Sequence, residues 1–194
     1  MKKGLINTII IFLFFTFAYS SCKQKSEYQR LVDSELATNI RQDSLFLGMS
    51  LQMDSKSFFG HCWELNKQGV LTNGVGNQIK YDASDYFENK TLMFFYPKFQ
   101  DGKIVEMPID FQYAEWALWN EDLKIENLLE EVKATLLEWY GGSFIKMVNE
   151  EGTKTVWVKV DGNRRIRVFR KSISEVSVVI TDLLELDAKK EEKS

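Results

Sequence analysis

A strict alternation of apolar and polar residues over 105–113 is the feature that most constrains the fold of this chain. Apolar side chains recur at every second position, from Val105 to Tyr113, with Glu106, Pro108 and Asp110 among the residues between them. A period of two is typical of a β-strand that buries one face. Because proline cannot donate a hydrogen bond to a neighbouring strand, Pro108 predicts an edge strand or a bulge at that point.

Further strands are predicted on both sides of this segment. Residues 91–96 form a continuous apolar run that ends at Pro97, and valines alternate over 156–160. Turn-forming residues occur after these runs in two places, at 100–103 and at 161–163, and each turn contains an Asp-Gly pair. The sequence therefore predicts strands over 70–113 and again over 143–182.

The clearest helix is predicted over 122–140. Asn120 is expected to cap it, and Gly141-Gly142 to end it. Its apolar side chains recur at helical spacing and form one stripe: Ile125, Leu128, Leu129, Val132, Leu136 and Trp139.

Two other helices have weaker patterns. The first, over 27–42, starts with a capping box at Ser26. The second, over 54–67, has Asp54 as its N-cap and Gly69 as a left-handed residue after its end. The fold class is therefore α+β, with two or three helices packed on an antiparallel sheet.

The order helix, strands, helix, strands leaves two architectures open. The chain contains either two copies of a helix-plus-hairpins unit or a single α+β domain that uses the same turn twice. This order resembles, at the level of fold, tandem helix-plus-sheet lipoproteins and secreted inhibitors. We assign the globular domain to residues 46–186 and a charged tail to 187–194.

The N-terminus has the pattern of a targeting segment. Lys2 and Lys3 precede an apolar run over 9–18, which is too short to span a bilayer, and small residues then lead to Cys22. This arrangement resembles a bacterial lipoprotein signal, although Tyr19 stands where such signals usually have leucine. The resemblance implies a signal peptide over 1–21, diacylation of Cys22, and an anchor plus N-terminal helix over 22–45. An ordinary secretory signal is the alternative.

The residues after Cys22 favour one membrane face. The sequence KQKSE has neither an acidic run nor an aspartate directly after the cysteine. We therefore expect a lipid-anchored protein on the periplasmic face of the outer membrane. Loss of Lys2 and Lys3 would leave 23 basic against 28 acidic residues in a chain of 173, and this acidic balance argues against nucleic acid as a partner.

Candidates for catalysis are few. His61 is the only histidine and Cys62 the only cysteine besides Cys22, and neighbours on a helix point about 100° apart, so they cannot form a nucleophile–base pair. We expect Cys62 to lie in the core, and we expect no metal and no cofactor. Carboxylate pairs such as Asp82 with Asp85 and Asp101 with Glu106 support only a weaker hypothesis, a carboxylate-dependent hydrolase.

Aromatic residues offer a candidate binding site. Tyr113, Trp116 and Trp119 cluster just before the long helix. They either fill the core or form a partly exposed platform for an envelope protein, a peptide or a glycan. The leading functional hypothesis is a non-enzymatic envelope lipoprotein of binding or accessory type. The alternative is an inhibitor-like or assembly-accessory subunit.

Overall fold

A computed structural model describes residues 25–185. The predicted signal peptide, Cys22 and the tail 187–194 lie outside this range. The described residues fall into two units, 25–31 and 32–185, and helix α2 (Glu27–Leu36) spans the boundary between them. No helix in the described range combines the length and the apolar character needed to cross a membrane.

Helix α2 begins as predicted and ends early. The amide of Gln29 donates to the hydroxyl of Ser26 at 3.2 Å, which is half of the predicted capping box. The helix stops at Leu36 and not at 42, because Asn39 takes a left-handed conformation with φ of 55°.

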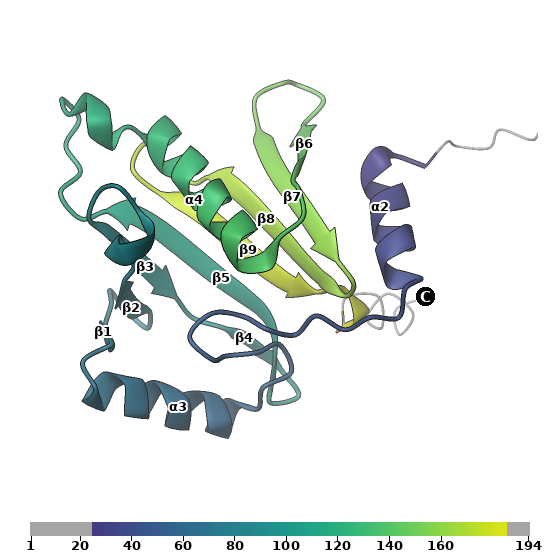
Figure 1. The fold of residues 1–194 in the computed structure, drawn as a ribbon, viewed down its shortest axis with the longest axis horizontal. Helices are drawn as coiled ribbons and strands as arrows, with labels where there is room; N and C mark the ends of the chain where they lie inside the picture. Colours follow the sequence, from purple (N-terminus) through teal and green to yellow (C-terminus); the bar gives the residue numbers. More distant parts are fainter. Residues whose placement is uncertain (1–24, 186–194) are drawn as a thin grey trace, which may run out of the picture. The chain divides into compact units, whose positions relative to one another are not determined.

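The main unit is built on one antiparallel sheet, which confirms the α+β class. Within residues 25–185 the sheet has nine strands in the order β1-β2-β3-β5-β9-β8-β7-β6, and β4 also pairs with β5 (Figure 1). The strands of the first half are β1 (Leu71–Asn73), β2 (Ile79–Asp82), β3 (Thr91–Phe95), β4 (Lys98–Gln100) and β5 (Lys103–Tyr113). Those of the second half are β6 (Ile145–Val148), β7 (Thr155–Asp161), β8 (Arg164–Arg170) and β9 (Val176–Asp182).

The two halves share one order of elements. Helix α3 (Ser55–Lys67) precedes β1, β2, β3 and β5, and helix α4 (Ile125–Tyr140) precedes β6, β7, β8 and β9. Each set of four strands runs as an antiparallel meander, and the last strands of the two sets, β5 and β9, pair with each other from Glu106↔Thr181 to Phe111↔Val176. The predicted repeat of helix and strands is therefore present as topology.

The two helices start as the capping patterns indicated, with one correction. Asp54 accepts a hydrogen bond from the amide of Ser57 at 3.0 Å, and Gly69 follows α3 with φ of 76°. Asn120 caps a short 3-10 turn, η3 (Glu121–Leu123), by accepting from the amide of Asp122, and α4 itself starts after Lys124. A second 3-10 turn, η2 (Ser84–Tyr86), joins β2 to β3.

Strand β5 lies inside the sheet, so the edge position expected from Pro108 is wrong. The strand pairs with β9 on one side and with β3 and β4 on the other. On the side of β5 away from β9, the partner strand changes from β3 to β4 at Pro108. Strand β3 pairs with β5 only as far as Ile109, and β4 begins opposite Glu106. The missing N–H group is tolerated at this gap between two partner strands.

The core lies between α4 and the centre of the sheet. Helix α4 contacts β5, β8 and β9 and buries six side chains, which are those of Ile125, Leu128, Leu129, Val132, Thr135 and Leu136. Beneath it, alternate positions of the three strands are buried: Met107, Ile109, Phe111, Ile166, Val168, Val176, Val178 and Ile180.

A segment without regular structure, residues 40–54, is held against the far end of the sheet by a polar network. The carboxylate of Asp182 is fully buried and accepts hydrogen bonds from Arg41 at 2.9 Å, Gln52 at 3.1 Å and Asn163 at 3.0 Å. Arg164 donates to the carbonyl of Ser44 at 2.6 Å. We call residues 40–54 the strap.

Candidate functional site

The predicted aromatic platform does not form. Tyr113 is buried, because as the last residue of β5 it points into the core like Phe111, and its hydroxyl donates to Glu131 at 2.7 Å. Trp116 packs against the core, and only Trp119 is open to solvent, with 86% of its surface exposed. The three rings therefore do not form one exposed surface, and a role of Trp116 and Trp119 in binding stays a prediction.

His61 and Cys62 hold structural positions. The Nε2 atom of His61 lies 2.6 Å from the carbonyl oxygen of Leu47 in the strap. Cys62, expected in the core, packs against it but is only half-buried, because α3 lies at the rim of the core. Burial raises the pKa of the Cys62 thiol to about 11, so the nucleophilic thiolate is scarce at neutral pH.

Two of the carboxylates considered for hydrolysis, Asp82 and Glu106, have local partners. Asp82 accepts from the amide and the hydroxyl of Ser84, and these hydrogen bonds lower its pKa, which is the wrong direction for a general acid. Glu106 forms an ion pair with Lys98 at 2.5 Å. Within residues 25–185, His, Cys, Asp and Glu side chains form no group of three or more that could hold a metal ion.

Two neighbouring strands, β7 and β8, separate at one end of their pairing. Strands β7 and β8 pair from Asp161↔Arg164 to Trp157↔Val168, and their register ends there. Both strands continue for two more residues, Thr155-Val156 on β7 and Phe169-Arg170 on β8. On their outer sides these residues pair with β6 and β9, while on their inner sides they face a gap (Figure 1).

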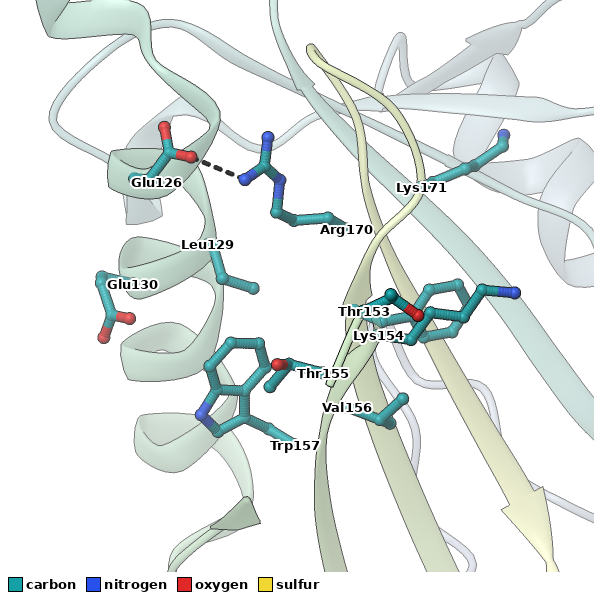
Figure 2. A pocket seen from close by; sticks show the side chains of 11 residues that line it. Glu126, Leu129, Glu130, Thr153, Lys154, Thr155, Val156, Trp157, Arg170 and Lys171 are labelled. Atoms are coloured by element: carbon teal, nitrogen blue, oxygen red, sulfur yellow. Dashed lines mark hydrogen bonds and ion pairs between the residues drawn. The ribbon is translucent and has the colours of Figure 1, made fainter. Parts of the chain in front are cut away.

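A cleft of about 780 Å³ occupies this gap and extends to α4 (Figure 2). Leu129 and Trp157 line it on the side of the helix, together with the carboxylates of Glu126 and Glu130. On the other face of the sheet, Val156 and Phe169 line it together with Lys154 and Lys171. We call this feature the β7–β8 cleft. Its volume lies within the range of about 300–1,000 Å³ that is usual for ligand sites.

Ion pairs and a cation–π contact hold the helix side of the cleft in shape. Arg170 reaches across from β8 to Glu126 at 2.7 Å, as Figure 2 shows. The ammonium group of Lys133 lies 4.8 Å from the centre of the Trp157 ring and also pairs with Glu130 at 2.7 Å. Trp157 therefore has a fixed position beside α4.

Sequence reasoning missed the cleft for a physical reason. The alternating valines of 156–160 predict the strand correctly. Trp157 lies between two of them and points to the opposite face of the sheet, toward α4. The separation of β7 from β8 depends on strand twist and on the packing of α4, and neither leaves a local pattern. The one available signal was a large aromatic residue between valines.

Comparison of the chain with protein-family models, with curated proteins and with solved structures gives no match.

Proposed function

We propose that this protein is a lipid-anchored cell-envelope protein of binding type, and that the β7–β8 cleft holds an extended polypeptide segment of an envelope partner. The anchor rests on the N-terminal sequence and its resemblance to a lipoprotein signal. The binding function rests on one observation: two strands stop pairing at Trp157↔Val168 while both remain extended beside a cleft.

Separated strand edges favour a polypeptide over other ligands. A strand without a neighbour presents a row of N–H and C=O groups, which an added strand can pair with. Here two such edges, at Thr155-Val156 and Phe169-Arg170, face the same cleft. A glycan or a small molecule has no matching row of alternating donors and acceptors. We therefore choose a peptide from the broader set of envelope protein, peptide or glycan.

The lining predicts the side chains of the bound segment. Residues of an extended chain point alternately to the two faces of a sheet. Those on the helix side would meet Leu129, Trp157 and the exposed carboxylate of Glu130. Those on the other side would meet Val156, Phe169 and Lys154. We expect a segment that is apolar at its centre, with a basic residue on the first face and an acidic residue on the second.

Exchange of charges across the cleft tests the binding proposal. Glu130→Lys combined with Lys154→Glu reverses the charge on each face of the cleft, where we expect the basic and the acidic residue of the bound segment, and leaves the Glu126–Arg170 ion pair intact. We expect this double variant to fold normally and to lose at least tenfold in affinity for the partner. The matched control is Glu64→Lys with Lys67→Glu, which inverts a similar exposed pair on α3, 3.0 Å apart, and should change nothing.

Identification of the partner requires a contact map. A photo-crosslinking residue at the exposed Thr153 should join the protein to one contiguous segment of one envelope protein, and a synthetic peptide of that segment should slow hydrogen exchange at Thr155 and Arg170, whose amides face the cleft. Crosslinks scattered over many proteins, or exchange that stays unchanged, would exclude the cleft as a peptide site.

The anchor is tested separately. We expect the mature chain to begin at Cys22 with a diacylglyceryl thioether, and Cys22→Ala to move the protein from the membrane to the soluble fraction. Intact mass spectrometry measures the first and fractionation the second. An unmodified N-terminus near Tyr19 or Ser21 would overturn the anchor while leaving the cleft proposal in place.

A further inference from the structure

The β7–β8 cleft is closed at one end, and this limits how a polypeptide can enter it. The pair Trp157↔Val168 joins the two strands at the inner end of the cleft, which we call the apex, and the strands stay paired from there to the turn at 161–164. A segment between the strands therefore cannot continue past the apex in the plane of the sheet. We infer that the cleft binds the free N-terminus of a partner chain, with the terminal ammonium group at the apex. This inference rests on the proposed function of the cleft.

A chain that continued would have to bend out of the sheet at the apex. Toward α4 it would meet the ring of Trp157, which lies against Lys133. Toward the opposite face it would pass between Val156 and Phe169, and Val158, the next residue of β7 on that face, is buried. Either bend leaves backbone groups of the segment without strand partners, which is unfavourable. A chain end needs no bend.

Strand β7 offers the longer row of backbone groups to the segment. The amide of Asn149 donates to the carbonyl of Lys154 at 3.0 Å. Because paired residues of antiparallel strands alternate between bonded and unbonded positions, the amide of Thr155 points away from β6 and into the cleft. Thr153, two positions earlier, also lines the cleft, and its amide has no hydrogen-bond partner within residues 25–185.

Strand β8 offers fewer such groups. The amide of Arg170 faces the cleft, but the amide of Ser172, the next residue on the same side, donates to the carbonyl of Glu175 at 3.3 Å in the turn to β9. An added segment therefore finds more partners on β7 than on β8.

The direction of the segment follows from the directions of the two strands. Because β7 and β8 are antiparallel, a single strand between them is antiparallel to one and parallel to the other. Antiparallel pairing is slightly more stable per residue, and β7 has the longer free edge, so we place the segment antiparallel to β7. Strand β7 runs from the open end of the cleft at Thr155 to the apex at Trp157. The segment runs the opposite way, so its N-terminus lies at the apex.

The charges along the cleft have the polarity that this direction requires. Glu130 lies near the apex, because its carboxylate binds Lys133 at 2.7 Å and the ammonium group of Lys133 lies 4.8 Å from the centre of the Trp157 ring. The side chain of Glu130 is 69% exposed, and a carboxylate accepts several hydrogen bonds, so a terminal ammonium group can share it. Lys154 lies toward the open end (Figure 2). A free C-terminus at the apex would instead place a carboxylate beside Glu130.

Display of one random heptapeptide library in three formats tests the inference on the whole purified chain. The heptapeptide has a free N-terminus in the first format, has a free C-terminus in the second, and lies between two Gly-Ser linkers in the third. We expect binders from the first format only. Synthetic copies should lose affinity about tenfold on N-acetylation, because the ammonium group no longer pairs with a carboxylate. A Gly-Ser-Gly-Ser extension should abolish binding at the N-terminus and be tolerated at the C-terminus.

Variants of the chain show whether the captured peptides occupy the cleft. Thr155→Pro removes the amide that faces the cleft and should abolish binding. Lys146→Pro is the matched control, because the amide of Lys146 points to the outer edge of β6 by the same alternation, and it should leave binding unchanged. Glu130→Gln should weaken the peptides with a free ammonium group and leave their N-acetylated copies unchanged. Glu64→Gln on α3, which is also paired with a lysine, should affect neither.

The outcomes separate this inference from the proposed function. Binders that are lost in Thr155→Pro but come equally from the linker format or the free C-terminus format would overturn the inference and leave the cleft as a peptide site. If no format yields a binder that depends on Thr155 or on Glu130, both the inference and the peptide site are wrong.

Discussion

Helices α3 and α4 occupy equivalent places in the chain, each before four antiparallel strands, yet they contribute differently to the fold. Helix α4 lies over β5, β8 and β9 in the middle of the sheet and buries six side chains. Helix α3 contacts β1 at the margin and buries one, Phe58. The same order of elements therefore produces a central helix in one half and a marginal helix in the other.

The difference has its origin in the side chains. The stripe of α4 is made mainly of large aliphatic residues, whereas the stripe of α3 consists only of Phe58, Cys62 and Leu65. The β7–β8 cleft borders α4. Helix α4 thus contributes far more to the core than α3 does, while the outward face of α3 is exposed to solvent.

The largest expected effect comes from shortening one leucine on each helix. Leu136→Ala on α4 removes a fully buried side chain and should lower the free energy of unfolding by about 4 kcal/mol, from lost burial and the cavity left behind. Leu65→Ala on α3 removes a half-buried one and should cost about 1 kcal/mol. Urea denaturation of both variants measures the difference. Equal losses would show that α3 is as central as α4.

The two Asp-Gly turns give the next comparison. Gly102 has φ of 75° with no atom near the position of an added Cβ, so Gly102→Ala should cost about 1 kcal/mol from backbone strain alone. Gly162 has φ of 55°, and an added Cβ would collide with the carbonyl oxygen of Ile40 in the strap. Gly162→Ala should therefore cost about 3 kcal/mol. Thermal denaturation of the two variants measures the difference in stability. Similar melting temperatures would show that the strap moves aside easily to accommodate the added methyl group.

Local patterns predicted most of the elements correctly. The caps at Asp54 and Ser26, the left-handed Gly69 and the alternation of 105–113 each depend on neighbours in sequence, and each is present. Apart from the end of α2 and the cap of α4, the errors concern contacts between distant segments. Pro108 lies inside the sheet because β3 and β4 divide one side of β5 between them, and no feature of residues 103–113 reveals that division.

The candidate sites were less predictable than the fold. Tyr113 seemed available for binding because it precedes a helix, but its position in the alternation with Phe111 already placed it on the core face. Arg164 belongs to a run of basic residues that we would assign to solvent, yet it is buried against Asp161 and Tyr140. Trp139 and Tyr140 line a hollow only because the strap, which lies nearly 100 residues earlier in the chain, packs beside them.

The pH dependence of stability tests how far the Cys62 thiol on α3 is buried in the core. Burial raises the pKa of this thiol from about 9 to about 11, so the folded state disfavours the thiolate. Stability should be unaffected below pH 9 and should fall as pH rises from 9 toward 11, because only the unfolded chain ionises freely there. Iodoacetamide should modify Cys62 at pH 8 more slowly in the folded protein than in urea, because burial raises the pKa of the thiol and lowers the fraction of thiolate. Equal rates would place Cys62 in solvent.

The smallest expected effect belongs to Trp63, on the outward face of α3. Its side chain is 61% exposed, and the ammonium group of Lys67 lies 5.5 Å from the ring centre. An exposed cation–π pair contributes little, so Trp63→Ala should change the free energy of unfolding by less than about 0.5 kcal/mol. Trp139→Ala on α4 is the matched contrast, since that ring contacts Phe46, Tyr86 and Tyr140. If Trp63→Ala instead lowers stability by about 2 kcal/mol, the outward face of α3 is a packed interface in the folded chain, and the two helices are more alike than their burial indicates.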